Sequence, residues 1–275
     1  MSTTTRWMEV ADGVLVRRYR AFDQNIVAVL GADETLLVDT RSTPEHAREI
    51  VADLAALRVP PVRVVVNTHG HFDHAFGNAI FRPAAVWGHE RCVPMLTTGF
   101  EAQRAWAMRD YPDLAEGLAE VEPDPPEHVF ASTASLALGS GGRTVELAYL
   151  GRGHTDNDIV IRVPDADLLC AGDLLENGAV PFFGDGYPLE WPATADAILG
   201  LLSERSVVVP GHGEHAGRAF VARQAAELHD LVALARRVHE GALDVESALA
   251  VAPFPAASAR EPLERALAQL RGDLG

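Results

Sequence analysis

The chain has 275 residues, and 23 basic residues against 39 acidic ones give it a formal net charge of −16. With 48% hydrophobic residues it can bury a sizeable core, which excludes general disorder. An acidic surface repels phosphate backbones and anionic lipids, so we expect a small-molecule substrate as the partner and neither nucleic acid nor a membrane. The two cysteines are too few for a disulfide scaffold.

The first ten residues contain no positively charged segment followed by an apolar run, which is the pattern of an export signal. No stretch reaches the roughly 18 consecutive apolar residues that a membrane-spanning helix needs. We therefore expect the protein to be cytoplasmic.

Short β-branched runs separated by turn residues open the chain. They predict strands at residues 14–16, 26–30 and 36–38. A helix is expected from residue 44, because Thr43 offers a hydroxyl N-cap and Pro44 suits the first helical turn. The continuous apolar run at 62–66 predicts a strand buried on both faces.

The second half of the chain continues the alternation after a mostly helical stretch at 89–120. Strands are expected at 144–150, 159–163, 168–170 and 206–209, and helices at 216–240, 243–251 and 259–272. Strands interleaved with helices predict a layered α/β fold. We expect one domain over residues 1–275, with a core at about 10–215 and a helical C-terminal extension at 216–275.

The most informative segment follows the predicted strand at 62–66. It places His69, His71, Asp73 and His74 within six residues. Neutral imidazoles and carboxylates are ligands for Zn²⁺ and related divalent ions, and the end of a buried strand can hold them in place. The segment therefore predicts a metal site.

Three further residues of ligand type stand next to glycine just beyond predicted strands. They are His154, Asp173 and His212. Glycine lets the backbone turn sharply and approach another segment closely. Each residue alone is a weak signal, because a single histidine after a strand is more often a surface or hydrogen-bonded residue. Together, and in this order, they are a strong one.

With these residues the chain resembles the metallo-β-lactamase superfamily over about residues 10–215. The resemblance consists of an H-x-H-x-D-H signature at 69–74, followed by His154, Asp173 and His212. It implies an α/β fold of four layers, an αβ/βα sandwich, here with extra C-terminal helices. It also implies two divalent metal ions at one edge, with zinc as the first candidate and iron or manganese as alternatives.

The same resemblance implies a role for each residue. The first ion would be held by His69, His71 and His154, and the second by Asp73, His74 and His212. Asp173 would bridge the two ions, and Asp73 could also orient a hydroxide or relay a proton, so Asp73 and Asp173 are the expected catalytic residues. Asp39 matches a position that supports the site in this family; a simple turn or helix-cap aspartate is the alternative.

The resemblance implies a hydrolase that cleaves an ester, thioester or lactone of a small molecule by a hydroxide shared between two metals. A mononuclear iron persulfide dioxygenase is the alternative, because it can share these ligand types. A β-lactamase is a weaker alternative. One lactamase branch has a cysteine ligand where this chain has Asp173, and the other branch with this signature lacks the bridging carboxylate.

Aromatic residues in a Gly/Pro-rich segment after Asp173 are candidates for lining the substrate pocket. They are Phe182, Phe183, Tyr187 and Trp191. Either they line a pocket near the metals or they anchor the segment to the body of the protein. Phe100 and Trp106 are candidates for the opposite wall. The arginines of the tail are interpreted as solvated surface: Arg260, Arg265 and Arg271.

Overall fold

The structure is a computed structural model that describes residues 6–274. Residues 1–5, which belong to the segment examined for an export signal, and residue 275 lie outside the described residues. Within residues 6–274, none of the helices combines the length and apolar character that crossing a membrane requires.

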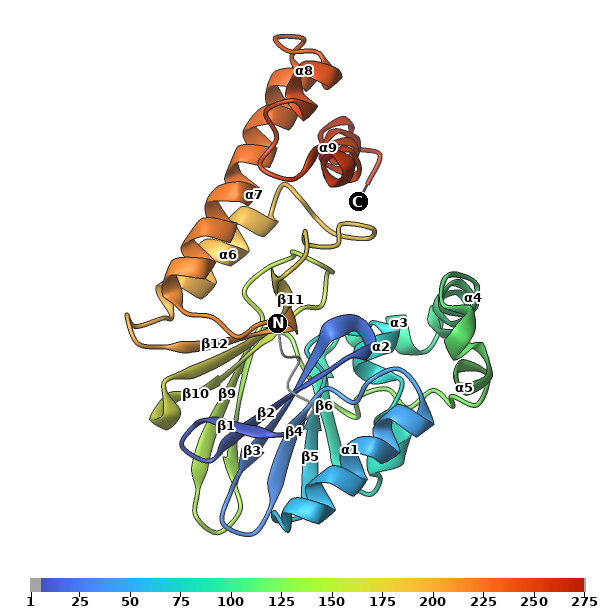
Figure 1. Cartoon of the computed structure of the whole chain (residues 1–275), viewed down its shortest axis with the longest axis vertical. Helices are drawn as coiled ribbons and strands as arrows, with labels where there is room; N and C mark the ends of the chain where they lie inside the picture. The colour runs from blue at the N-terminus through green and yellow to red at the C-terminus, as the bar shows by residue number, and fades with distance from the viewer. Residues whose placement is uncertain (1–5, 275) are drawn as a thin grey trace.

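The N-terminal half of the chain builds one half of a large sheet, which α1 (Pro44–Leu57) covers (Figure 1). Its strands are β1 (Met8–Ala11), β2 (Val14–Tyr19), β3 (Gln24–Leu30), β4 (Thr35–Val38), β5 (Val62–Val66), β6 (Ala85–His89) and β7 (His128–Phe130). Strands β4 to β7 run parallel, whereas β1 to β4 form antiparallel pairs. Helix α1 begins as predicted, because the Thr43 side chain accepts a hydrogen bond from the His46 N–H.

The C-terminal half supplies the rest of the sheet. Its strands are β8 (Thr133–Leu138), β9 (Arg143–Ala148), β10 (Val160–Val163), β11 (Leu168–Asn177) and β12 (Val207–Gly213). Strands β8 to β11 are antiparallel neighbours, and β12 runs parallel to β11. A single antiparallel pair, His212 with Gln24, joins β12 to β3 and connects the two halves.

The buried residues define four layers. Apolar side chains of both sheet halves, such as Val27 and Ile161, pack against each other in a common core. The outer face of the first half packs on Ile50 and Leu54 of α1. The outer face of the second half packs on α6 (Trp191–Gly200), α7 (Arg218–His239) and α9 (Ala256–Arg271). The predicted αβ/βα sandwich with extra C-terminal helices is confirmed.

The remaining helices extend the sandwich at one end. They are α2 (Phe72–Ala75), α3 (Cys92–Leu96), α4 (Phe100–Asp110), α5 (Ala115–Ala119) and α8 (Val245–Leu249). In Figure 1, α6 to α9 rise from one side of the sandwich, and α4 and α5 project from the other. Two helical regions that are distant in sequence therefore flank the same end of the sheet.

Several elements differ from the prediction. Strands β11 and β12 continue past Gly172 and Gly211, so Asp173 and His212 lie inside strands and not beyond them. The prediction ended β11 too early because the strand passes through an irregular pairing at Gly172, where an added Cβ would approach the Thr68 side chain to 2.7 Å. Strands β1, β6, β7 and β8 and helix α6 were not predicted. These strands lack an uninterrupted β-branched run.

Candidate metal centre

The seven predicted residues come from distant parts of the chain and meet at one end of the sandwich. His69 follows β5, His71 precedes α2, Asp73 and His74 lie in α2, His154 lies between β9 and β10, Asp173 in β11 and His212 in β12. Five of the seven are buried, and His71 and His212 are partly buried. The short-range signature and the three later residues thus belong to one site.

Hydrogen bonds fix the histidine-rich segment to the loop that carries His154. The Gly70 N–H donates to Asn157 Oδ1 over 2.9 Å. The Thr68 carbonyl accepts from the Ile159 N–H over 2.8 Å. Because both partners follow His154 within five residues, the two segments hold their histidines at a fixed separation.

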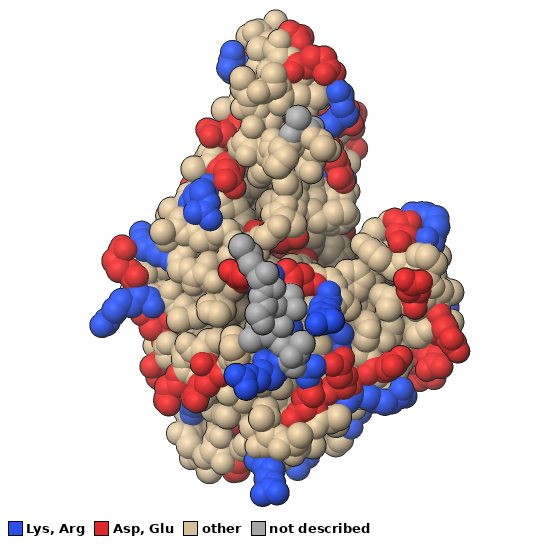
Figure 2. All heavy atoms as spheres, viewed as in Figure 1, with Lys and Arg blue, Asp and Glu red and all other residues tan. Residues whose placement is uncertain are grey.

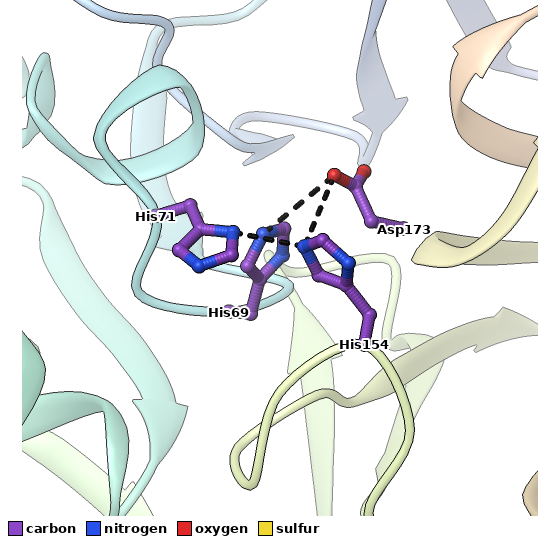
Figure 3. Close-up of side chains that lie close together, drawn as sticks. All are labelled: His69, His71, His154 and Asp173. Carbon is purple, nitrogen blue, oxygen red and sulfur yellow. Dashed lines mark hydrogen bonds and ion pairs between the residues drawn. The ribbon is translucent and has the colours of Figure 1, made fainter. Parts of the chain in front are cut away.

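The first cluster consists of His69, His71, His154 and Asp173, whose potential ligand atoms all lie within 4.8 Å of one another (Figure 3). His154 Nε2 lies 2.8 Å from His71 Nδ1 and 3.4 Å from Asp173 Oδ2. His69 Nε2 lies 3.8 Å from the same carboxylate oxygen. Three imidazoles and one carboxylate therefore converge on a common volume.

The second cluster consists of Asp73, His74 and His212, again within 4.8 Å. Asp73 Oδ2 lies 3.4 Å from both His74 Nε2 and His212 Nε2, and these two nitrogens are 3.3 Å apart. Asp173 also contacts this cluster, since its Oδ1 lies 3.3 Å from His74 Nε2 and its Oδ2 lies 3.2 Å from His212 Nε2. The Asp173 carboxylate thus stands between the two clusters.

Each of the five histidines is oriented by a contact at its far ring nitrogen. The contacts are His69 Nδ1 to Thr68 Oγ1 (3.0 Å), His71 Nε2 to Asp185 Oδ2 (3.0 Å), His74 Nδ1 to Asp39 Oδ2 (2.8 Å), His154 Nδ1 to the Phe182 carbonyl (3.0 Å) and His212 Nδ1 to the Phe22 carbonyl (2.7 Å). Such contacts fix the ring and its tautomer in metal sites. The inner nitrogen of every ring is left to face the clusters.

Asp39 belongs to this supporting network. Its carboxylate accepts hydrogen bonds from the Thr68 N–H and hydroxyl, both over 2.8 Å, in addition to its contact with His74. The supporting role implied by the family resemblance therefore agrees with the structure better than a simple turn or cap. Four other supports were missed: the Thr68 hydroxyl, Asp185 and the carbonyls of Phe22 and Phe182. A carbonyl has no sequence signature, and Asp185 stands in a Gly-Asp-Gly context that suggests only a turn.

The donor set fits divalent cations. His69 Nε2 is buried and has no hydrogen-bond partner within residues 6–274, and the buried Asp173 Oδ1 has its ion-pair contact with His74 Nε2 but no hydrogen bond there. Leaving buried polar atoms unpaired is costly, and such atoms call for an explanation such as an ion. Five imidazole nitrogens and two carboxylates in two adjoining groups suit two divalent ions with nitrogen and oxygen ligands.

Burial and the two aspartates set the protonation of the histidines. Burial lowers the pKa of His69 well below its usual value and that of His154 to about 4. Burial acts in the same direction on His212, but the charges of Asp173 and Asp73 outweigh it and raise its pKa to about 9. Metal ligands must be deprotonated, so binding of a cation would displace protons from the second cluster.

A cavity of about 1090 Å³ opens onto both clusters. Figure 2 shows the surface hollowed between the C-terminal helices and the part of the molecule that carries α4. Five aromatic residues line the cavity: Phe22, Phe72, Trp106, Tyr111 and Phe182. Arg91 and the carboxyl groups of Glu176 and Glu261 also line it. Burial, followed by the charge of Asp173, raises the pKa of Glu176 to about 7.

The aromatic segment after Asp173 does both things expected as alternatives from the sequence: one ring lines the cavity, and others anchor the segment to the core. Phe182 lines the cavity and is 42% exposed, whereas Phe183 and Trp191 are buried in the core and anchor the segment. Trp106 lines the opposite side, as expected. The expectation for Phe100 is wrong, because its ring is 2% exposed and packs in a separate core with Phe76.

The interpretation of the tail arginines is correct for two of them. Arg260 and Arg271 are exposed and pair with surface carboxylates. Arg265 is not free surface, because its guanidinium donates to the Gly186 carbonyl over 2.6 Å and also to the Gly184 carbonyl. Sequence could not show this, because the bonds join residues about 80 positions apart.

The sequence matches the metallo-β-lactamase superfamily over residues 19–212, a range that holds both clusters. The chain belongs to the metallo-β-lactamase superfamily. A metallo-β-lactamase type 2 of Bacillus sp. (strain 170) is 34% identical over 182 residues, which cover 65% of this chain and 62% of that protein. A metallo-β-lactamase type 2 of Bacteroides fragilis is 32% identical over 99 residues, covering 35% of this chain and 39% of the relative.

Solved structures of the superfamily share the fold. A metallo-β-lactamase from Pontibacter korlensis superposes with a TM-score of 0.62 at 20% identity, covering 82% of this chain and 98% of that one. In sequence, the chain spans less than two thirds of the length of the curated relatives named above. Residues 216–275, which include Arg265, lie beyond the part matched by the superfamily.

Proposed function

We propose that the chain is a metal-dependent hydrolase that binds two divalent ions and cleaves an ester, thioester or lactone of a small molecule. The observation that carries the proposal is the placement of Asp173, whose two oxygens contact the first and the second cluster. A carboxylate shared by two ligand groups is what a binuclear site needs. Zinc is the proposed ion, because the donors are imidazoles and carboxylates in groups of three and four.

The residues of each cluster would hold one ion: His69, His71 and His154 the first, and Asp73, His74 and His212 the second, with Asp173 common to both. When bound, such ions supply Lewis acidity and make water nucleophilic near neutral pH. The protein keeps these residues ready by fixing every imidazole from its far side. This preorganisation means that few groups need to reorient during the reaction.

Two carboxyl groups can accept or donate protons beside the reacting bond. Asp73 lines the cavity and its Oδ2 faces both histidines of the second cluster, so it can orient a water molecule or take up its proton. Glu176 lines the same cavity, and in its protonated form it could deliver a proton to a leaving group. Neither role requires a residue outside the cavity.

The aromatic wall supports a substrate with an apolar part. Phe182 lies close to both the first cluster and the opposite wall, because its ring centroid is 6.0 Å from that of His154 and 6.5 Å from that of Trp106. A substrate bound against these rings would present its scissile group to the clusters. Since aromatic contacts favour apolar groups, we propose an ester, thioester or lactone with an apolar acyl group.

β-Lactam hydrolysis is a second candidate, because curated relatives carry the name metallo-β-lactamase. One experiment compares the two. The purified protein is analysed for zinc, iron and manganese and then assayed against aryl esters, thioesters, lactones and a chromogenic β-lactam, before and after removal of metal by a chelator.

We expect about two zinc ions per chain and hydrolysis of the acyl substrates that is lost with the metal and restored by zinc. A preference for the β-lactam would favour the second candidate. One iron per chain together with no hydrolysis of any substrate would contradict both candidates and favour persulfide oxygenation.

A further inference from the structure

A loop between β11 and α6 orients two histidines of the first cluster. This site loop, residues 178–190, contributes Asp185, whose Oδ2 lies 3.0 Å from His71 Nε2. It also contributes the Phe182 carbonyl, which lies 3.0 Å from His154 Nδ1. The inner nitrogens of these two histidines are 2.8 Å apart and face the proposed metal. The position of the site loop therefore sets the position of two of the three imidazoles of this cluster.

The C-terminal helix α9 holds the site loop from its outer side. Arg265 donates hydrogen bonds to the Gly184 and Gly186 carbonyls, which flank Asp185. Gln269, one turn further along, accepts from the Leu189 N–H over 2.9 Å. Helix α9 also lines the substrate cavity through residues 257, 258, 261 and 262. A helix outside the part matched by the superfamily thus reaches both the cavity and the loop behind the first cluster.

We propose that Arg265 is a positioning residue for the first cluster, acting through Asp185 on His71. The proposal depends on the metal centre proposed above. The guanidinium group is a planar fork that bonds two acceptors in a fixed relative position. Here the two acceptors are the carbonyls on either side of Asp185, so the fork fixes the backbone from which Asp185 reaches His71.

The local sequence explains why such support is useful. The residues before and after Asp185 are both glycines, which have the widest range of backbone conformations, and within the segment one backbone hydrogen bond, from the Gly186 N–H to the Phe183 carbonyl over 2.9 Å, closes the turn around Asp185. Arg265 is half-buried, and both of its hydrogen bonds found within residues 6–274 go to the site loop. Arg260, on the same helix, is exposed and bonds Glu246 and Glu264, so it offers a matched control.

The proposal is tested by measuring the dissociation constant of Zn²⁺ in competition with a chromogenic chelator. Arg265→Met keeps the aliphatic stem but removes all donors, and we expect it to weaken the binding of one zinc ion by about 10-fold, the lower end of the effect of supporting contacts. Arg265→Lys can bond one carbonyl at a time and should restore part of the affinity. Arg260→Met should leave the affinity of both ions unchanged.

The Asp185→Ala variant tests whether Arg265 affects zinc binding through Asp185. If Arg265 acts through Asp185, the double variant should bind zinc about as weakly as the weaker single variant, because both changes remove the same support. A double variant whose loss of zinc affinity equals the product of the two single losses would overturn the proposed route. So would wild-type zinc affinity in Asp185→Ala, and this measurement is decisive even if Arg265→Met does not fold.

The failure of this proposal can be distinguished from the failure of the proposed function. A wild-type chain that binds no zinc would contradict the metal centre itself. A wild-type chain that binds two zinc ions, with a folded Arg265→Met variant that binds them equally tightly, would overturn only the role of Arg265. A lower Tm without any change in zinc affinity would assign Arg265 a purely structural role and would also overturn it.

Discussion

The two clusters contain similar side chains but are supported by different parts of the molecule. In the second cluster, His74 is held by Asp39, a buried residue directly after β4, and His212 is itself part of β12. In the first cluster, His71 and His154 are held by the site loop. The second cluster is thus supported next to the sheet, whereas two of the three imidazoles of the first cluster are supported by a loop that α9 holds in place.

The supports of the two clusters also differ in their position relative to the part matched by the superfamily. The supports of the second cluster lie within residues 19–212, the part matched by the superfamily. The support of the first cluster includes Arg265, which lies outside that part. We therefore expect changes near the sheet to affect folding and metal binding together, and changes in the site loop to affect metal binding with little effect on folding.

Asp173→Asn should have the largest effect, because Asp173 is the residue that the two clusters share. A neutral amide cannot offset the charge of two cations or present two equivalent anionic oxygens to them. We expect a folded protein that loses at least one ion and more than about 100-fold of its activity, beyond the range for supporting residues alone. Elemental analysis measures the loss of the ion and kcat/KM measures the loss of activity. Full activity with two ions bound would refute the proposal that both ions share Asp173.

His74→Ala and His154→Ala remove one imidazole from each cluster, and each variant should bind one ion far more weakly. Their stabilities should differ. On the far side of each ring, removing His74 takes a partner from the buried Asp39 carboxylate, whereas removing His154 takes one from the Phe182 carbonyl on the site loop. We expect the metal-free His74 variant to be less stable by about 1–3 kcal/mol, the usual cost of a buried polar group left unpaired. Equal unfolding free energies would remove this distinction between the clusters.

Asp39→Asn and Asp185→Asn compare the two supports directly. Both should weaken zinc binding by about 10–100-fold, as is usual for residues that orient metal-binding histidines. Only Asp39→Asn should also lower the Tm of the metal-free protein, because its carboxylate accepts two further hydrogen bonds from Thr68 in the interior. A similar loss of Tm in both variants would show that the site loop is as much a part of the folding core as the sheet.

The sequence was sufficient to predict the parts of the site that depend on short-range pattern. The spacing of His69 to His74 after an apolar strand marks a ligand segment, and residues preceded by glycine near the later apolar runs complete the set, although two of them lie inside strands. The layered fold could also be predicted, because its central strands are continuous apolar runs. These features are local, and each is visible within about ten residues.

What could not be predicted depends on contacts between distant segments. The Phe22 carbonyl reaches His212 across 190 positions, and Arg265 reaches the site loop across about 80. A backbone carbonyl has no residue type, and an arginine on a helix has the same sequence signal whether it faces water or a loop. Phe100 was misplaced for the same reason, because an aromatic residue in an irregular helical region fits a cavity wall and a core equally well.

Phe182→Ala should have the smallest effect and should concern substrate selection alone. Phe182 is 42% exposed and lines the cavity, whereas its neighbour Phe183 is 1% exposed and packs against Trp191 and Phe254. The Phe182 ring would contact the substrate equally in the ground and transition states, so its loss should raise KM for a long acyl ester by about 10-fold, within the range of one apolar pocket contact, and leave kcat nearly unchanged. Phe183→Ala is the matched control and should cost about 3–5 kcal/mol of stability with an unchanged ratio of KM between short and long acyl substrates. If Phe182→Ala instead lowers the Tm and leaves that ratio unchanged, both rings serve only to anchor the site loop, and the substrate must be recognised by the opposite wall around Trp106.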